Sequence, residues 1–422
     1  MAELVVHGGK RLMGTVRAAG SKNAAVTLLP AALLAREPVR IDNVPPVADV
    51  EAGLEALAEL GVQAGWAEGS VVIDLPRLQP GTGRPHVAGA LARRWRASIL
   101  FLAPLLARCG EAVVGWPGGC RLGSRPIDWH LKALRAMGAT IEVGGGYIVA
   151  RARRLFGAEI HLDYPSVGVT EQILLAAATA DGRTIIHNAA RDPEVIDLAT
   201  FLGRLGARVF GVGTPTVRID GVPALGGAHH TVMPDRVEAG TYLWMAVATG
   251  GDVRVEGVIP EHLDAVLNKV AETGASIERG DDWVRAVVNA RPAAVRLITQ
   301  AYPGFPSDLQ PIATAALCRA QGTSLITETV FPHRFDHVAE LRRLGASLTL
   351  EGSTAIVEGT QTLTGAPLAA NDLRAAAALL VGALAAEGSS TLDSGGALHR
   401  GYPALTEKLA ALGAGIGVPT HG

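Results

Sequence analysis

One signature recurs six times along the chain and limits its fold more than any other feature: a helical stretch ends at a glycine, and a β-rich run follows. Glycine just beyond the last helical turn adopts the left-handed conformation that caps a helix. By subtraction of their numbers, the stop glycines lie 77, 68, 68, 71 and 68 residues apart, which predicts six copies of one folding unit. The six stops are Leu60-Gly61-Val62, Met137-Gly138-Ala139, Leu205-Gly206-Ala207, Thr273-Gly274-Ala275, Leu344-Gly345-Ala346 and Leu412-Gly413-Ala414.

Each predicted unit begins with a helix that is apolar nearly all round, which is typical of a buried helix. A short strand, a one-sided helix and a pair of strands follow in each unit. Because the repeat step exceeds that of open solenoids, the sequence predicts an α/β protein with six β-α-β-α-β-β units, three in each of two compact pseudo-threefold domains. The inner helices are expected over residues 23–35, 97–107, 170–180, 239–249, 308–320 and 372–386.

The strand-like start Leu4-Val5-Val6 precedes the first inner helix and needs a partner elsewhere. The simplest closure pairs it with the second half of the chain, so the chain is expected to cross between the domains twice. The predicted first domain spans residues 22–232, and the second combines residues 1–21 with residues 233–422. The active site is expected in the cleft between them.

Composition excludes several classes of function. Apolar residues make up 48% of the 422 residues, charged residues 18%, and the net charge is −2, which gives no electrostatic case for nucleic acid or membrane as a partner. Three cysteines without clustered spacing predict neither a disulfide framework nor a zinc site, and they fit a reducing compartment. The N-terminal residues lack a signal-peptide pattern, and the longest apolar runs are shorter than a membrane span. We therefore expect a cytoplasmic location.

The segment from Trp116 to His130 has the most unusual composition in the chain, with one cysteine, two arginines and three glycines. Its Pro-Gly-Gly run is a poor continuation of any helix or strand, so a loop is expected. Neighbouring guanidinium groups favour the reactive thiolate form of a cysteine. Two interpretations follow: a lid that closes over a ligand and carries a reactive Cys120, or a glycine-rich surface turn with an incidental cysteine.

Cationic residues stand at the starts of inner helices and at the junctions between strands and outer helices. If these ends converge, they form a strongly positive cleft, and arginine forks suit carboxylates and phosphates. A small polyanionic ligand is therefore predicted; the alternative for each single residue is a solvated charge or a surface ion pair. Asp308 is a carboxylate among them, either a helix N-cap or a general base that orients a hydroxyl. The cationic set is Lys22, Arg96, Arg125, Arg334, Arg374 and Arg400.

Six motifs together resemble the UDP-N-acetylglucosamine 1-carboxyvinyltransferase (enolpyruvyl transferase) family, in order and from about residue 3 to about residue 416. They are Ser21-Lys22-Asn23-Ala24-Ala25, the Pro-Gly-Gly-Cys loop with Gly-Ser-Arg-Pro-Ile-Asp, Tyr164-Pro165-Ser166-Val167-Gly168, Pro234-Asp235-Arg236-Val237-Glu238-Ala239-Gly240-Thr241, Pro303-Gly304-Phe305-Pro306-Ser307-Asp308, and Asn371-Asp372-Leu373-Arg374.

The resemblance implies a two-domain inside-out α/β barrel and a reaction without metal or organic cofactor. In that reaction the 3′-hydroxyl of UDP-N-acetylglucosamine attacks C2 of phosphoenolpyruvate while C3 gains a proton. A tetrahedral ketal forms and then loses phosphate, in the first committed step of peptidoglycan synthesis. These two small molecules are the implied partners, and the drug fosfomycin is the implied inhibitor.

The resemblance also implies roles for individual residues. Cys120 would be the acid at C3, Asp308 would take or orient the hydroxyl proton, and Lys22 and Arg400 complete the catalytic set. The implied phosphoenolpyruvate-binding residues are Lys22, Arg125, Arg334, Arg374 and Arg400. The implied residues for the nucleotide sugar are Asn23, Arg96, Arg125, Pro126, Ile127, Asp128, Trp129, Ser166, Val167, Gly168, Asp308 and Val330.

The chain departs from the family pattern in two places. Ala397 and His399 replace a histidine and an acidic residue before Arg400, and Pro332-His333 replaces a Glu-Asn pair. Two alternatives therefore stay open: a paralogue that acts on another nucleotide or nucleotide sugar in secondary metabolism, and a non-catalytic nucleotide-sugar sensor. The sensor predicts loss of the acid or the base, yet Cys120 and Asp308 are both present.

Overall fold

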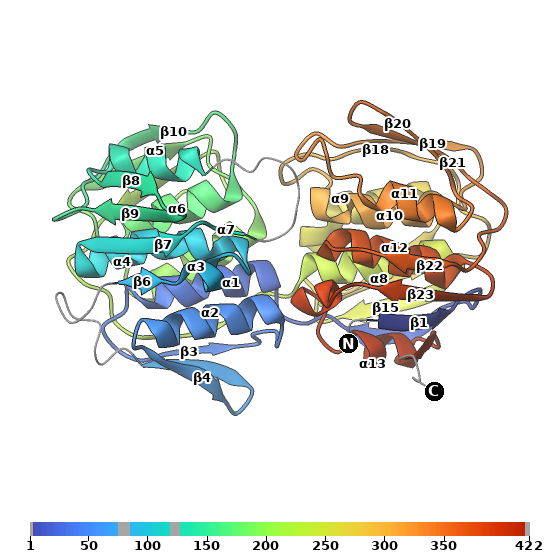
Figure 1. Cartoon of the computed structure of the whole chain (residues 1–422), viewed down its shortest axis with the longest axis horizontal. Coiled ribbons are helices and arrows are strands. Elements are labelled where there is room, and N and C mark those ends of the chain that lie inside the picture. Colours follow the sequence, from blue (N-terminus) through green and yellow to red (C-terminus); the bar gives the residue numbers. More distant parts are fainter. Residues whose placement is uncertain (1–2, 75–84, 119–126, 418–422) are drawn as a thin grey trace. The chain divides into compact units, whose positions relative to one another are not determined.

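The computed structural model describes residues 3–74, 85–118 and 127–417. This part of the chain divides into two compact units (Figure 1). The first unit contains residues 20–74, 85–118 and 127–233, and the second contains residues 3–19 and 234–417. Among the described residues, no helix has the length and apolar character needed to cross a membrane.

Each unit contains three four-stranded sheets with one shared topology: one end strand of each sheet runs parallel to its neighbour, and the remaining neighbours run antiparallel. In the first unit the orders are β14(Ala228–Thr231)-β3(Val39–Asp42)-β5(Ser70–Asp74)-β4(Gln63–Ala67), β6(His86–Val87)-β7(Glu111–Gly115)-β9(Tyr147–Arg151)-β8(Thr140–Gly144), and β10(Glu159–His161)-β11(Arg183–His187)-β13(Thr216–Asp220)-β12(Arg208–Phe210). In the second unit they are β16(Ser276–Arg279)-β17(Trp283–Val287)-β15(Asp252–Glu256)-β2(Met13–Arg17), β18(Arg296–Ile298)-β19(Thr323–Thr327)-β21(Thr354–Glu358)-β20(Ser347–Glu351), and β22(Pro367–Ala369)-β23(Ser389–Asp393)-β1(Glu3–His7)-β24(Gly415–Gly417).

The helices fall into inner and outer sets. The inner helices are α1(Lys22–Ala32), η1(Arg96–Phe101) continuing into α4(Leu102–Cys109), and α6(Val167–Ala177) in the first unit, with α8(Arg236–Thr249), η3(Ser307–Leu309) continuing into α10(Gln310–Leu317), and α12(Leu373–Ala385) in the second. The remaining helices are α2(Ala48–Glu59), α3(Gly89–Ala92), α5(Asp128–Ala136), α7(Pro193–Arg204), η2(Pro260–Leu263), α9(Asp264–Glu272), α11(His337–Arg343), η4(Ala397–Arg400) and α13(Leu405–Ala411).

The six predicted glycine stops are confirmed. Each follows the helix-ending residue of an outer helix and has a backbone φ between 78° and 106°, the left-handed region that a side chain disfavours. The predicted inner helices are also confirmed, with ends that differ from the expected ones by several residues. Helix periodicity and capping glycines therefore carried enough information to locate all six units.

Strand exchange explains how the chain closes each unit. Parallel neighbours need a crossover connection, and in four sheets an inner helix provides it. The other two sheets exchange partners: β2 precedes α1 but pairs with β15, while β14 precedes α8 but pairs with β3. The expected pairing of residues 4–6 with the second half of the chain is confirmed, because β1 pairs with β23 and β24.

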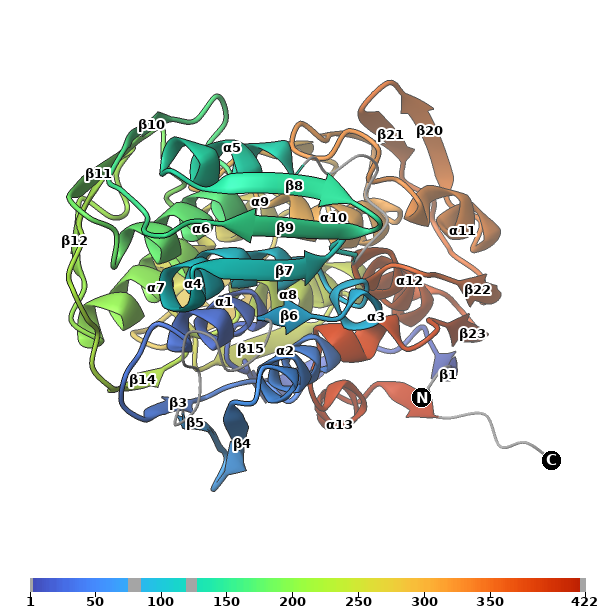
Figure 2. The same ribbon diagram turned by 60° about the vertical axis from the view of Figure 1, so that its left-hand side comes forward.

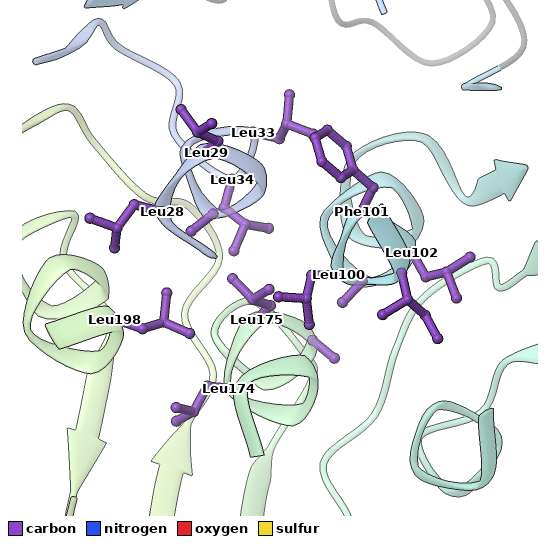
Figure 3. Close-up of a cluster of buried hydrophobic side chains, with 14 of the residues drawn as sticks. Leu28, Leu29, Leu33, Leu34, Leu100, Phe101, Leu102, Leu174, Leu175 and Leu198 are labelled. Atoms are coloured by element: carbon purple, nitrogen blue, oxygen red, sulfur yellow. The ribbon is translucent and has the colours of Figure 1, made fainter. Parts of the chain in front are cut away.

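The inner helices form the core of each unit, and the sheets lie outside them. Leucines from α1, η1, α6 and α7 converge in the middle of the first unit (Figure 3), and the sheet of β6, β7, β8 and β9 lies on its outside (Figure 2). In the second unit α8, α10 and α12 pack against one another. Burying each leucine contributes about 1.5–3 kcal/mol, so these helices are rigid supports for the polar residues at their starts.

Candidate active site

Asp308 lies between two arginines in the second unit. Arg334 donates from Nη1 to Oδ1 of Asp308, and Arg374 donates from Nη2 to Oδ2, each over 2.8 Å. Both guanidinium side chains are 5% exposed, and the carboxylate is 25% exposed. Three residues that the sequence singled out therefore meet in one ion-paired cluster, and the interpretation of these two arginines as surface charges is wrong.

Local structure explains why the carboxylate is available to both arginines. The N-cap positions of η3 and α10 are Pro306 and Leu309, so the interpretation of Asp308 as a helix cap is wrong. At the start of α12 the cap is Asp372, whose carboxylate accepts from the backbone N–H of Ala375 over 2.8 Å. Asp308 instead projects from the one-turn helix η3 toward the arginines.

Each arginine has a second anchor. Nη1 of Arg334 also donates to Oγ of Ser307 over 3.0 Å, and its guanidinium carbon lies 4.9 Å from the centre of the Phe331 ring. Nη1 of Arg374 donates to the hydroxyl of Tyr402 over 3.3 Å. Since planar guanidinium groups hold fixed hydrogen-bond directions, these contacts orient both arginines toward Asp308.

The charges of this cluster shift the pKa values of its members. Burial acts to lower the pKa of Arg374, but the nearby Asp308, with smaller contributions from Tyr402 and Asp235, raises that pKa above its ordinary value. Burial raises the pKa of the Tyr402 phenol, against the opposing charge of Arg374. Arg374 therefore stays cationic and Tyr402 stays neutral at physiological pH.

His337, at the start of α11, is a further buried titratable group beside Arg334. Burial lowers its pKa to about 3, the positive charge of Arg334 acts in the same direction, and Asp372 opposes them. The imidazole is 1% exposed and therefore neutral at physiological pH. Sequence reasoning did not single out His337, because a lone histidine in a one-sided helix has no distinguishing pattern.

Of the predicted phosphate-binding cations in the described chain, Lys22 stands at a helix start and Arg400 lies between strand β23 and helix α13. Lys22 is the first residue of α1, where the Ser21 hydroxyl accepts from the backbone N–H of Ala24. Its Nζ lies 3.4 Å from Oδ2 of Asp49, near the start of α2. Arg400 is the last residue of η4 and is half-buried.

The predicted nucleotide-sugar residues of the first unit lie mostly at helix starts. Two of the stretches meet: a Cβ added to Gly168 would lie 3.2 Å from Cε1 of His130, so glycine permits a close approach of α6 and α5. Ser166 is the N-cap of α6, Val167 and Gly168 begin that helix, Ile127 is the buried N-cap of α5, Asp128 and Trp129 begin it, Arg96 begins η1, and Asn23 is the second residue of α1.

A buried carboxyl group that sequence reasoning missed lies one turn into α6. Burial raises the pKa of Glu171 well above its ordinary value, and the negative charges of Glu194 and Asp192 raise it further. Glu171 is 4% exposed. Its surroundings therefore favour the protonated form of this acid near the first residues of α6.

Two of the three cysteines belong to the described residues, and neither is activated. Burial raises the pKa of Cys318 to about 12 and raises that of the half-buried Cys109. Cys120, Arg125 and Pro126 lie outside the described residues. No group of three or more His, Cys, Asp or Glu side chains suited to a metal ion occurs within residues 3–74, 85–118 and 127–417.

The sequence model of the family described as EPSP synthase (3-phosphoshikimate 1-carboxyvinyltransferase) matches residues 6–409. The chain belongs to this family. Two relatives of this carboxyvinyltransferase come from Carboxydothermus hydrogenoformans. UDP-N-acetylglucosamine 1-carboxyvinyltransferase 1 is 48% identical over 416 residues, covering 99% of this chain and 98% of the relative. UDP-N-acetylglucosamine 1-carboxyvinyltransferase 2 is 46% identical over 418 residues, covering 99% of each.

Solved structures support the fold. The enolpyruvyl transferase NikO from Streptomyces tendae has a TM-score of 0.87 and 29% identity to this carboxyvinyltransferase, covering 99% of each chain. An EPSP synthase from Acinetobacter baumannii has a TM-score of 0.75 at 21% identity and full coverage of both chains, which is a likeness of fold alone. The predicted two-domain inside-out α/β barrel with six repeats is confirmed, as is the prediction of a carboxyvinyl transferase.

Proposed function

We propose that this carboxyvinyltransferase transfers the enolpyruvyl group of phosphoenolpyruvate to the 3′-hydroxyl of UDP-N-acetylglucosamine and releases phosphate. The single observation that carries the proposal is the near-full-length match, at 46–48% identity, to two proteins named for that activity. The reaction is the first committed step of peptidoglycan synthesis. It serves cell-wall formation and hence cell shape and division, and we place it in the cytoplasm.

The Asp308 cluster supports the addition step. The 3′-oxygen of the sugar forms a bond to C2 of phosphoenolpyruvate, its proton passes to Asp308, and C3 receives a proton from Cys120. A carboxylate that is 25% exposed and fixed by two arginines is suited to accept a proton from a bound hydroxyl. The tetrahedral ketal then loses a C3 proton and its phosphate, which leaves the enolpyruvyl ether.

The cations bind different parts of phosphoenolpyruvate in this proposal. Lys22, Arg125 and Arg400 bind the phosphate, which leaves as an anion and is stabilised by positive charge. Arg334 and Arg374 bind near the carboxylate of phosphoenolpyruvate. A guanidinium group has five N–H donors, and the contact of each arginine with Asp308 uses only one of them. The others are available for further hydrogen bonds.

We also assign the residues that bind the nucleotide sugar and the boundaries of the two domains. The residues that hold the nucleotide sugar are Asn23, Arg96, residues 125–129, residues 166–168, Asp308 and Val330. We place the domain boundaries at residues 22–232 and at 1–21 plus 233–422, so Lys22 and Cys120 belong to one domain and Asp308 to the other.

Phosphate release from phosphoenolpyruvate tests the function. We expect release with UDP-N-acetylglucosamine as acceptor, and none with UDP alone or with N-acetylglucosamine alone. Release only with a different nucleotide or nucleotide sugar would replace the proposal with a paralogue of altered specificity. The test with other nucleotides is needed because the chain departs from the family pattern at the exposed Pro332-His333 pair and at His399. No release with any acceptor would favour a nucleotide-sugar sensor.

Fosfomycin tests the assigned acid. Alkylation is expected at Cys120 and at neither Cys109 nor Cys318, because burial raises the pKa of both described thiols and keeps them protonated. Intact-mass and peptide mass measurements locate the adduct. A protein without an adduct, or an adduct on Cys109 or Cys318, contradicts the assignment.

A further inference from the structure

Glu328 directly follows β19 and is fully buried beside the Asp308 cluster. Its Oε1 accepts from Oγ1 of Thr299 over 2.8 Å and from the backbone N–H groups of Val330 and Phe331 over 2.8 and 2.9 Å. Its Oε2 accepts from Oγ of Ser307 over 2.8 Å. A buried carboxylate is tolerated only when donors surround it, and four donors from three segments do so here.

The bond from Ser307 fixes the direction of a hydroxyl. Serine has one O–H proton, and that proton points at Oε2 of Glu328, so a lone pair of Ser307 remains for Nη1 of Arg334 at 3.0 Å. The same Nη1 donates to Oδ1 of Asp308 over 2.8 Å. Because hydrogen bonds in series strengthen one another, the position of Arg334 against Asp308 depends on the carboxylate of Glu328.

The same carboxylate also holds the chain segment that leads to Arg334. Its bonds to the N–H groups of Val330 and Phe331 close the turn after β19, and the Phe331 ring lies 4.9 Å from the guanidinium carbon of Arg334. Charge gives a further reason for an acid at this position. Two buried guanidinium groups face Asp308, and a second carboxylate within one hydrogen-bonded link of Arg334 balances the excess positive charge.

We propose that Glu328 is a positioning residue of the active site, acting through Ser307 to hold Arg334 against Asp308. The inference rests on the proposed function, in which Asp308 takes the proton of the attacking hydroxyl. Glu328 itself touches no reacting atom in this assignment. Its effect on turnover passes through Ser307 and through the turn of Val330 and Phe331 that leads to Arg334.

Three substitutions separate positioning from structural support. Ser307→Ala breaks the link to Arg334 but leaves the turn bonds of Glu328, and Ser307→Thr keeps the hydroxyl. Thr299→Val removes a donor of the same 2.8 Å length to the same buried carboxylate, together with an acceptor for the backbone N–H of Thr329, but it removes no hydrogen bond of Arg334. Thr299 and Ser307 are both buried, so the alanine and valine variants are matched in depth.

We expect Ser307→Ala to lower kcat by about tenfold, because a hydrogen bond to a charged group is lost, with little change in KM for UDP-N-acetylglucosamine. The acidic limb of its kcat profile should move to higher pH, since an arginine held at hydrogen-bond distance favours the ionised form of a carboxylate. Ser307→Thr should recover most of the turnover. Thr299→Val should lower the melting temperature while kcat and its pH profile stay close to wild type.

Glu328→Gln is the direct variant, with an expected loss of about tenfold to a hundredfold in kcat. If it does not fold, the serine pair decides the question alone. Equal kcat for Ser307→Ala and wild type, or an equal fall in kcat for Ser307→Ala and Thr299→Val, would overturn the positioning role.

Wild-type phosphate release, measured in parallel, separates this inference from the proposed function. A wild-type protein that releases no phosphate with any acceptor defeats the function. Crystal structures of the serine variants then judge the inference by themselves. A displaced Arg334 in Ser307→Ala but not in Ser307→Thr supports it, and an unmoved Arg334 in both rejects it.

Discussion

The two arginines that hold Asp308 are themselves held in different ways. Arg334 donates to Ser307, which donates to the buried carboxylate of Glu328, so this support ends on a charge. Arg374 donates to the hydroxyl of Tyr402, and Tyr402 lies 3.0 Å from Oγ1 of Thr241. We call these the Arg334 arm and the Arg374 arm.

In the Arg374 arm, the groups that support the arginine are all neutral. Oγ1 of Thr241 donates to the carbonyl of Val237 over 2.8 Å, so the Tyr402 hydroxyl donates to Thr241 while it accepts from Arg374. This chain of bonds ends on the backbone of α8, whereas the other ends on a carboxylate. A hydrogen bond to a charged group is stronger than a hydrogen bond between neutral groups. The difference predicts unequal responses to substitution.

The largest effect is expected where the arms meet. Asp308→Ala removes the proposed base and should lower kcat by about 10²–10⁴-fold, while binding of UDP-N-acetylglucosamine changes far less. It also leaves two buried guanidinium groups without their shared carboxylate, a loss that costs about 3–5 kcal/mol for one such buried pair. Steady-state kinetics, titration calorimetry with the nucleotide sugar and urea unfolding measure the three quantities.

Asp308→Asn is the matched control, because it keeps the shape and one acceptor oxygen but does not ionise. We expect it to be as inactive as the alanine variant and more stable. Equal losses of turnover and of sugar affinity in both variants would make Asp308 a binding residue only.

The sequence could identify Asp308, Arg334 and Arg374 because each stands at a helix start or a strand-to-helix junction of a recognisable repeat. It could not identify their supports. Glu328 follows the strand run of residues 323–327, and nothing local shows that its carboxylate turns inward to four donors. Tyr402 is a lone tyrosine whose partners, Thr241 and Arg374, are far away in the chain.

The fold was easier to predict than the site for a physical reason. Capping glycines and helix periodicity are local features, and they repeat six times, so each copy supports the others. The pairings of β2 with β15 and of β14 with β3 join segments that are far apart in the chain, so local sequence patterns do not show them. Only the pairing of residues 4–6 with the second half of the chain was expected from the sequence. Hydrogen bonds between distant side chains have no such repetition.

An intermediate effect is expected from acid on His337, the buried imidazole beside Arg334. The pKa of buried His337 is lowered to about 3 from an ordinary 6.5, so the unfolded chain binds a proton between these values and the folded protein does not. Stability from this group is therefore complete above pH 6.5 and falls as the pH falls toward 3, by about 2 kcal/mol at pH 5. His337→Phe, which has no titratable group, should lose less stability than wild type between pH 8 and pH 5.

Urea unfolding of both proteins at the two pH values checks this prediction. Other groups, such as Glu171 with its raised pKa, are common to both proteins and cancel in the difference. A wild-type protein and a variant that lose the same free energy of unfolding would show that His337 does not contribute to the loss of stability in acid.

The smallest effect is expected from Tyr402→Phe on the Arg374 arm. The substitution keeps the buried ring but removes the hydroxyl that accepts from Arg374 over 3.3 Å, a longer bond than the 2.8 Å bond of Arg374 to Asp308. Because Asp308 still holds the guanidinium, we expect kcat to fall by only about threefold, the effect of one weak hydrogen bond. Steady-state kinetics against Ser307→Ala makes the comparison direct. A loss for Tyr402→Phe that exceeds the loss for Ser307→Ala would reverse the ranking of the arms and show that the neutral chain, not the buried carboxylate, sets the geometry at Asp308.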